Sequence, residues 1–107
     1  MATKGDNAKD EGASVAKTMA KLIAPLSKDQ VEKLTIDAIR EHRALLARSE
    51  AAYDALEKAE AAQADTAGTL REAYTRVMLA ARAQQMVLAT LVERLGFIPQ
   101  VPPASRR

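Results

Sequence analysis

Apolar residues recur at helical spacing through most of this chain, and a first long stretch carries them without interruption by proline or glycine. Side chains repeating every three or four residues share one face of a helix. The pattern therefore predicts a long helix over about residues 28–64. One apolar stripe reads Val31, Leu34, Ala38, Leu45, Ala52, Leu56, Ala59, and a neighbouring stripe reads Ile36, Ile39, Leu46, Tyr53.

A second long stretch has a cleaner apolar seam, whose steps alternate between four and three residues as in a coiled coil. It predicts a helix over about residues 69–95. Gly96 follows the last periodic residue, which is typical of a helix that ends in the left-handed conformation. Pro99 and Pro102 then prevent the helix from resuming. The seam reads Leu70, Tyr74, Val77, Ala81, Gln84, Leu88, Leu91, Leu95.

Local signals mark where these helices start. Ser27 and Gln30 have the spacing of a capping box, in which each side chain bonds the other residue's backbone amide. Leu26, just before the cap, is placed to pack on Val31 as a hydrophobic staple. Between the helices the sequence predicts a break over residues 65–69, where Gly68 interrupts the pattern and Thr66 or Thr69 can cap the second helix.

The remaining segments are short. Residues 1–14 are polar and small, and they predict a disordered tail because they bury too little apolar surface to offset ordering. Residues 15–24 predict a short helix or arm that ends before Pro25. Residues 25–103 form the predicted hairpin domain, and residues 104–107 a loose tail.

The expected fold is all-α: two long antiparallel helices joined by a short turn. Each helix is apolar over a wider arc than one partner helix covers, so we expect a homodimer that forms a four-helix assembly. The residues expected in the core of the hairpin or of the dimer are Val31, Leu34, Ile39, Leu45, Leu46, Tyr53, Leu70, Tyr74, Val77, Leu88, Leu91.

Composition excludes several functional classes. The chain has no cysteine, which leaves no disulfide or thiolate metal site. No apolar run approaches the roughly 18 residues of a membrane span, and the polar N-terminus does not resemble a signal peptide. A cytoplasmic protein is expected. The net charge is only +2, with 16 basic and 14 acidic residues interspersed, whereas a nucleic-acid binder gathers its basic residues on one face.

Nothing in the sequence predicts catalysis. The single histidine, His42, lies mid-helix without a surrounding set of carboxylates arranged for a metal, and glycines do not cluster into a phosphate-binding loop. We therefore expect no enzyme activity, no cofactor, no metal and no small-molecule ligand. Direct DNA binding is a weaker possibility, since Asp37, Glu41 and Glu50 surround the arginines of the first helix.

Two separated segments resemble a known family. Thr35-Ile36-Asp37-Ala38-Ile39-Arg40, followed by His42 and Arg43, and Leu95-Gly96-Phe97-Ile98-Pro99 are similar to the two motifs of the TraM family. Its members are antiactivators of quorum sensing in conjugative plasmid transfer. The resemblance covers about residues 26–101, and the N-terminal tail and residues 50–68 depart from the pattern.

The resemblance implies a regulatory partner. TraM-like proteins bind a TraR-like transcriptional activator of the LuxR type and keep it off its promoter, so that transfer genes stay silent. The alternatives are a plasmid-encoded DNA-binding accessory or antitoxin-like dimer, and a coiled-coil adaptor without a regulatory target. If the resemblance holds, interface energy concentrates in aromatic and arginine anchors, although Phe97 and Ile98 could instead cap the dimer core. The expected partner-binding residues are Arg40, His42, Arg43, Leu95, Phe97, Ile98, Pro99.

Overall fold

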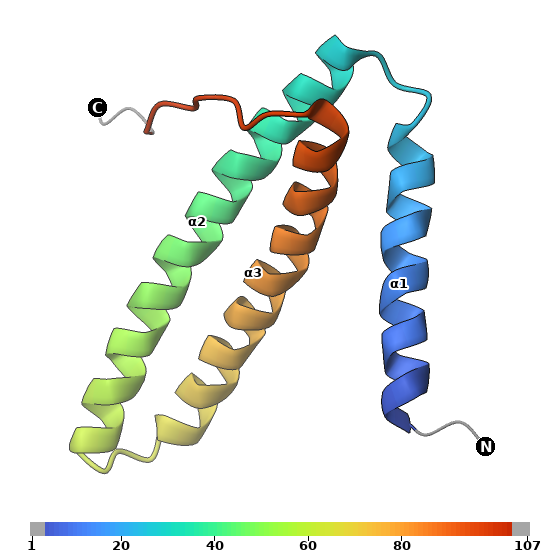
Figure 1. The fold of residues 1–107 in the computed structure, drawn as a ribbon. Coiled ribbons are helices and arrows are strands. Elements are labelled where there is room, and N and C mark those ends of the chain that lie inside the picture. Colours follow the sequence, from blue (N-terminus) through green and yellow to red (C-terminus); the bar gives the residue numbers. More distant parts are fainter. Residues whose placement is uncertain (1–3, 104–107) are drawn as a thin grey trace.

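The computed structural model describes residues 4–103, with side chains from Ser14 onward. It contains three helices, α1 (Lys4–Ile23), α2 (Lys28–Ala61) and α3 (Ala67–Leu95), and this part of the chain has no strand. Helices α2 and α3 lie side by side and run antiparallel, while α1 lies along α3 on the side away from α2 (Figure 1). The predicted all-helical hairpin is confirmed.

The start of α2 follows from its sequence. Ser27 is extended at the N-cap, and its hydroxyl accepts from the Gln30 amide at 3.2 Å, while the Gln30 side chain accepts from the Ser27 amide at 2.9 Å. The predicted capping box is thereby confirmed. Leu26 packs against the cluster that contains Val31, as a hydrophobic staple requires.

The buried seam of α2 includes polar residues that its apolar stripes missed. Buried or half-buried side chains follow one another at alternating steps of four and three: Val31, Thr35, Ala38, His42, Leu45, Ser49, Ala52, Leu56, Ala59. The hydroxyl of Thr35, which is 0% exposed, donates to the Val31 carbonyl at 2.7 Å, and that of Ser49 donates to Leu46. These bonds allow the two hydroxyls to be buried, because a buried hydroxyl without a hydrogen-bond partner destabilises the fold.

The seam of α3 lies where its spacing predicts, with Ala81, Leu91 and Leu95 buried. Leu91 and Leu95 form a core cluster with Val31 and Ala38 of α2. Of the expected core residues, Val31, Ile39, Leu45 and Leu91 are buried, and four on α3 are half-buried: Leu70, Tyr74, Val77, Leu88. Three on α2 are exposed in the single chain: Leu34, Leu46, Tyr53.

The turn between the helices falls earlier than predicted. Helix α2 ends at Ala61 and α3 begins at Ala67, so the turn spans residues 62–66 and Gly68 lies within α3. The chain reverses at Gln63, whose φ is +52°. Thr66 occupies the N-cap position of α3 but makes no capping bond with its side chain. The prediction took glycine to mark the turn, whereas a non-glycine residue adopts the left-handed conformation here.

The N-terminal boundary also needs correction. Helix α1 begins at Lys4, where the sequence predicted a disordered tail up to Ser14 and a helix only from residue 15. The composition argument underestimated helix extension, because adding residues to an existing helix is far easier than nucleating one. Ala8, Lys9, Glu11 and Ala13 are strong helix formers. The predicted loose tail over residues 104–107 lies outside the described residues.

Candidate protein-binding surface

The C-terminal segment is held across α2 by specific contacts. Gly96 ends α3 with a φ of +95°, and its amide donates to the Val92 carbonyl at 2.8 Å, which confirms the predicted left-handed stop. The chain then crosses α2 (Figure 1). Val101 is buried, and the Arg43 guanidinium donates to the Pro102 carbonyl at 3.2 Å. The segment is therefore fixed at both ends of its course over the helix.

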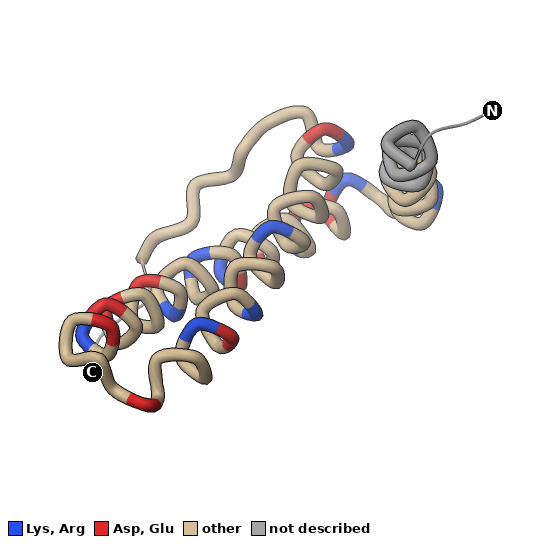
Figure 2. The backbone as a smooth tube through the Cα atoms, turned by 90° about the horizontal axis from the view of Figure 1, so that it is seen from below, with Lys and Arg blue, Asp and Glu red and all other residues tan. Residues whose placement is uncertain are grey.

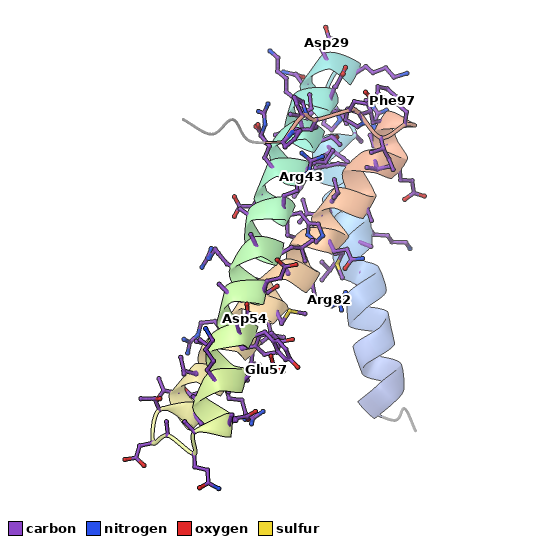
Figure 3. The ribbon with its side chains drawn as sticks, turned by 90° about the vertical axis from the view of Figure 1, so that its left-hand side faces the viewer. Asp29, Arg43, Asp54, Glu57, Arg82 and Phe97 are labelled. Atoms are coloured by element: carbon purple, nitrogen blue, oxygen red, sulfur yellow. The ribbon has the colours of Figure 1, made fainter. Side chains whose placement is uncertain are left out.

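Anchoring of this segment leaves two large apolar side chains in solvent. Phe97 is 47% exposed and Ile98 is 71% exposed. Leu95 before them and Pro99 after them are buried. Of the four apolar residues expected to contact a partner, Leu95 and Pro99 therefore anchor the segment. Phe97 and Ile98 are exposed to solvent. Figure 3 shows Phe97 at the end of the hairpin where α2 begins, near Asp29.

The basic side chain of Arg43 contacts the same segment. Arg40 and Arg43 lie about one turn apart on α2, and both are exposed. A shallow hollow of about 520 Å³ is lined by Arg43 and by the crossing segment. The structure therefore brings Arg43 together with the C-terminal motif, although 59 positions separate Arg43 from Pro102 in sequence. Arg43 therefore places a positive charge beside the distal part of the crossing segment.

His42 occupies a different environment from its neighbours in the motif. It is half-buried within the α2 seam, and its Nδ1 atom is buried without a hydrogen-bond partner among the described residues. Its position, four residues after Ala38 and three before Leu45, directs it toward α3 rather than toward the surface that carries Arg40 and Arg43. Gln84 of α3 reaches the same region, with its amide donating to the Ala38 carbonyl at 3.4 Å.

One structural arginine was not anticipated from the sequence. The guanidinium of Arg94, near the end of α3, donates to the carbonyls of Ala24 and Leu26 at 3.1 and 3.5 Å. These carbonyls belong to the linker between α1 and α2, where no backbone amide of a helix donates to them. Arg94 therefore ties the linker to the hairpin. A helical-pattern analysis cannot find this contact, because it joins residues 70 positions apart.

The rest of the surface is electrostatically mixed. Acidic and basic positions are interspersed along α2 and α3, without a face of one sign (Figure 2). Arg71 pairs with Glu60 across the turn. On α2, the carboxylate of Glu57 raises the pKa of Tyr53, whose ring lies 5.6 Å from that of Tyr74. This pattern does not resemble a surface that tracks a phosphate backbone.

Within residues 14–103, no group of three or more histidine, aspartate or glutamate side chains is arranged to hold a metal ion. None of the helices in the described range is long and apolar enough to cross a membrane.

Comparison with known proteins gives one consistent result. A family model described as Prokaryotic Transcriptional repressor TraM matches residues 1–100. The Transcriptional repressor TraM of Agrobacterium fabrum (strain C58) is 35% identical over 69 residues, which cover 64% of this chain and 68% of that protein. The protein of the same name from Rhizobium radiobacter is 35% identical over 71 residues, covering 66% and 70%. No solved structure matches significantly.

Proposed function

Because this chain belongs to the family of prokaryotic TraM transcriptional repressors, which gives it a regulatory role, we propose that it is an antiactivator. In this proposal it binds a TraR-like transcriptional activator of the LuxR type and prevents the activator from binding DNA. Conjugal transfer genes then remain repressed until active activator exceeds the antiactivator. No catalytic step is needed, since the threshold follows from stoichiometric binding.

The observation that carries this proposal is the exposure of Phe97 and Ile98 on an anchored backbone. A segment fixed in advance loses little conformational freedom on binding, which favours affinity. Exposed aromatic and arginine side chains are also the residues that contribute most to the binding energy of protein interfaces. The buried residues Pro99 and Val101 anchor the segment, and Arg43 helps to anchor it through its bond to the Pro102 carbonyl.

A homodimer is part of the proposed function. The three helices form a thin layer, with principal extents of 56 × 52 × 15 Å. Stable domains bury the apolar faces of their helices between at least two layers. Leu34, Leu46 and Tyr53 remain exposed in the single chain, so a second copy supplies the missing layer most simply.

The test is a gel-shift assay with a signal-bound LuxR-type activator and its promoter DNA. The unmodified protein should abolish the activator's shift and should produce none alone. Phe97→Ala and Ile98→Ala should each remain folded and need about thirtyfold more protein for inhibition, if each side chain contributes about 2 kcal/mol as interface anchors do.

Leu79→Ala is the matched control. Leu79 is also a large exposed apolar residue, but it lies in α3 away from the C-terminal segment, so its truncation should leave inhibition unchanged. A direct shift of DNA by the protein alone would instead favour the DNA-binding accessory. Inhibition unaffected by either substitution in the C-terminal segment would refute the proposed contact surface.

A further inference from the structure

A hollow of about 340 Å³ lies between α2 and α3, in the half of the hairpin nearer the turn. Tyr53 of α2 and Tyr74 of α3 form its aromatic part, with ring centroids 5.6 Å apart and ring planes tilted by 54°. Tyr53 is 46% exposed, so much of its ring remains available to another molecule. The other lining residues are Ser49, Glu50, Asp54, Met78.

Three carboxylates of α2 surround the tyrosine pair. Glu50 and Asp54 line the hollow about one helical turn apart, and the carboxylate of Glu57 is close enough to Tyr53 to raise the pKa of its phenol. Because the steps between the three acids are four and three residues, they lie on one side of the helix. Figure 3 shows Asp54 and Glu57 together on α2, far from the end of the hairpin that carries Phe97.

The chain does not neutralise these carboxylates itself. Within residues 14–103 an ion pair joins Arg71 to Glu60, and none involves the three acids around the hollow. Arg82 of α3 donates instead to the side chain of Gln85 at 3.1 Å. Lys58, the nearest basic residue in the sequence, does not line the hollow. The carboxylates repel one another, so a cation that binds among them is stabilised.

An aromatic ring beside carboxylates favours a basic side chain as the occupant. The face of a tyrosine ring attracts a cation, and a carboxylate accepts charge-assisted hydrogen bonds from guanidinium or ammonium groups. The activator proposed as the partner binds DNA, and a DNA-binding protein gathers arginine and lysine on its surface. The proposed partner therefore carries the charge that complements this hollow.

The hollow and the C-terminal segment lie on the same side of the hairpin. Arg43, Leu46, Glu50 and Tyr53 follow one another at steps of three and four residues, and all four are exposed, so they share one side of α2. Arg43 bonds the crossing segment, and ten residues of helix separate it from Tyr53, or roughly 15 Å. A protein interface of ordinary size, about 800 Å² on each partner, spans such a distance.

We propose that this acidic–aromatic hollow binds an arginine or lysine side chain of the activator, as a second contact beside the C-terminal segment. This inference rests on the proposed function and adds the chemistry of recognition, with apolar contact at Phe97 and Ile98 and ionic contact at the hollow. Leu34 lies in a separate hollow bounded by α1. A second copy that covers Leu34 therefore leaves this side of α2 accessible to the activator.

Removal of charge tests the ionic part of the contact. Glu50→Gln with Asp54→Asn keeps the shape of the hollow and should need at least tenfold more protein to abolish the activator's gel shift. Raising the salt from about 50 to about 200 mM should weaken this variant less than the unmodified protein, because it lacks the charges that salt screens.

The matched control is Asp65→Asn with Glu72→Gln. It changes the net charge equally and lies at the same end of the hairpin, and both residues are exposed outside the hollow. It should inhibit the activator like the unmodified protein, with the same dependence on salt.

Two substitutions at Tyr53 test the aromatic part. Tyr53→Phe keeps the ring and should inhibit like the unmodified protein. Tyr53→Leu keeps an apolar side chain without a ring and should inhibit about two- to fivefold more weakly, as for a cation over an exposed ring. Circular dichroism and sedimentation velocity should show that every variant folds and associates like the unmodified protein.

Four results overturn the proposal, and they are distinguishable. Equal inhibition by the charge variant and its control excludes an ionic contact at the hollow, while the proposed function stands. Equal inhibition by Tyr53→Leu and Tyr53→Phe excludes a cation over the ring. Loss of self-association in the charge variant, but not in its control, assigns this side of α2 to a second copy of the chain. If the unmodified protein leaves the activator's shift intact, the proposed function itself fails.

Discussion

Gly68 and Gly96 predict opposite effects of one chemical change. Gly96 has a φ of +95°, whereas Gly68 is the second residue of helix α3. A Cβ atom added at either position meets no atom within 4 Å. Substitution by alanine therefore introduces no steric overlap at either site. What differs is the backbone conformation, which makes the pair a direct test of the helix boundaries.

The magnitudes follow from that conformation. Alanine at position 96 must adopt the left-handed region, which costs about 1–2 kcal/mol. Alanine at position 68 favours the helix over glycine by about 0.5–1 kcal/mol. For a domain of this size 1 kcal/mol corresponds to roughly 4–8 °C. Gly96→Ala should thus lower the melting temperature by roughly 4–16 °C, and Gly68→Ala should raise it by roughly 2–8 °C.

Thermal unfolding followed by circular dichroism measures both effects. All variants must be compared at one protein concentration, since association makes the melting temperature depend on concentration. Gly96→Asn is a useful third variant, because asparagine tolerates the left-handed region better than alanine, and it should fall between glycine and alanine. An unchanged melting temperature for Gly96→Ala would refute the left-handed stop and with it the course of the C-terminal segment.

Three further substitutions test other parts of the fold. Ser27→Ala removes the capping box and should lower the free energy of unfolding by about 1 kcal/mol, measured by urea unfolding; no loss would mean that α2 starts elsewhere. Leu91→Ala truncates a side chain that is 5% exposed and should cost about 2–5 kcal/mol; a loss below 1 kcal/mol would contradict the core. Glu57→Gln should lower the pKa of Tyr53, which the Glu57 carboxylate raises, as followed by ultraviolet titration of the phenol in a Tyr74→Phe background. Because folding favours the protonated phenol of Tyr53, the contribution of this phenol to stability is complete below its unfolded pKa of about 10. It is lost as the pH rises through the folded pKa. An unchanged titration of Tyr53 in the Glu57→Gln variant would exclude Glu57 as the cause of the raised pKa.

The helices and most of their ends could be predicted from sequence. The capping box at Ser27 and the stop at Gly96 are local motifs, whose hydrogen bonds and dihedral angles involve residues within a few positions of one another. The α3 seam is likewise periodic and almost entirely apolar. The turn was misplaced because glycine normally supplies positive φ, and here Gln63 adopts it.

The α2 seam shows where an apolar pattern fails. Thr35, His42 and Ser49 occupy seam positions, yet their polarity removes them from a count of hydrophobic residues. Thr35 and Ser49 each donate a hydrogen bond from the hydroxyl to a carbonyl of the same helix. A pattern of hydrophobic residues does not reveal such bonds. In the expected partner-binding set, Arg40 and Arg43 share an exposed side of α2, whereas His42, which lies between them in sequence, is half-buried in the seam.

The sequence by itself determined the helical class, the hairpin, the caps and the family resemblance, because each depends on interactions between near neighbours or on a motif. Only the tertiary structure decided which side of each helix stays exposed. It paired Arg43 with Pro102 and Arg94 with the α1–α2 linker, presented Phe97 and Ile98 between buried neighbours, and placed α1 as one wall of a groove. These features join residues that lie tens of positions apart, and their geometry exists only once the helices have packed.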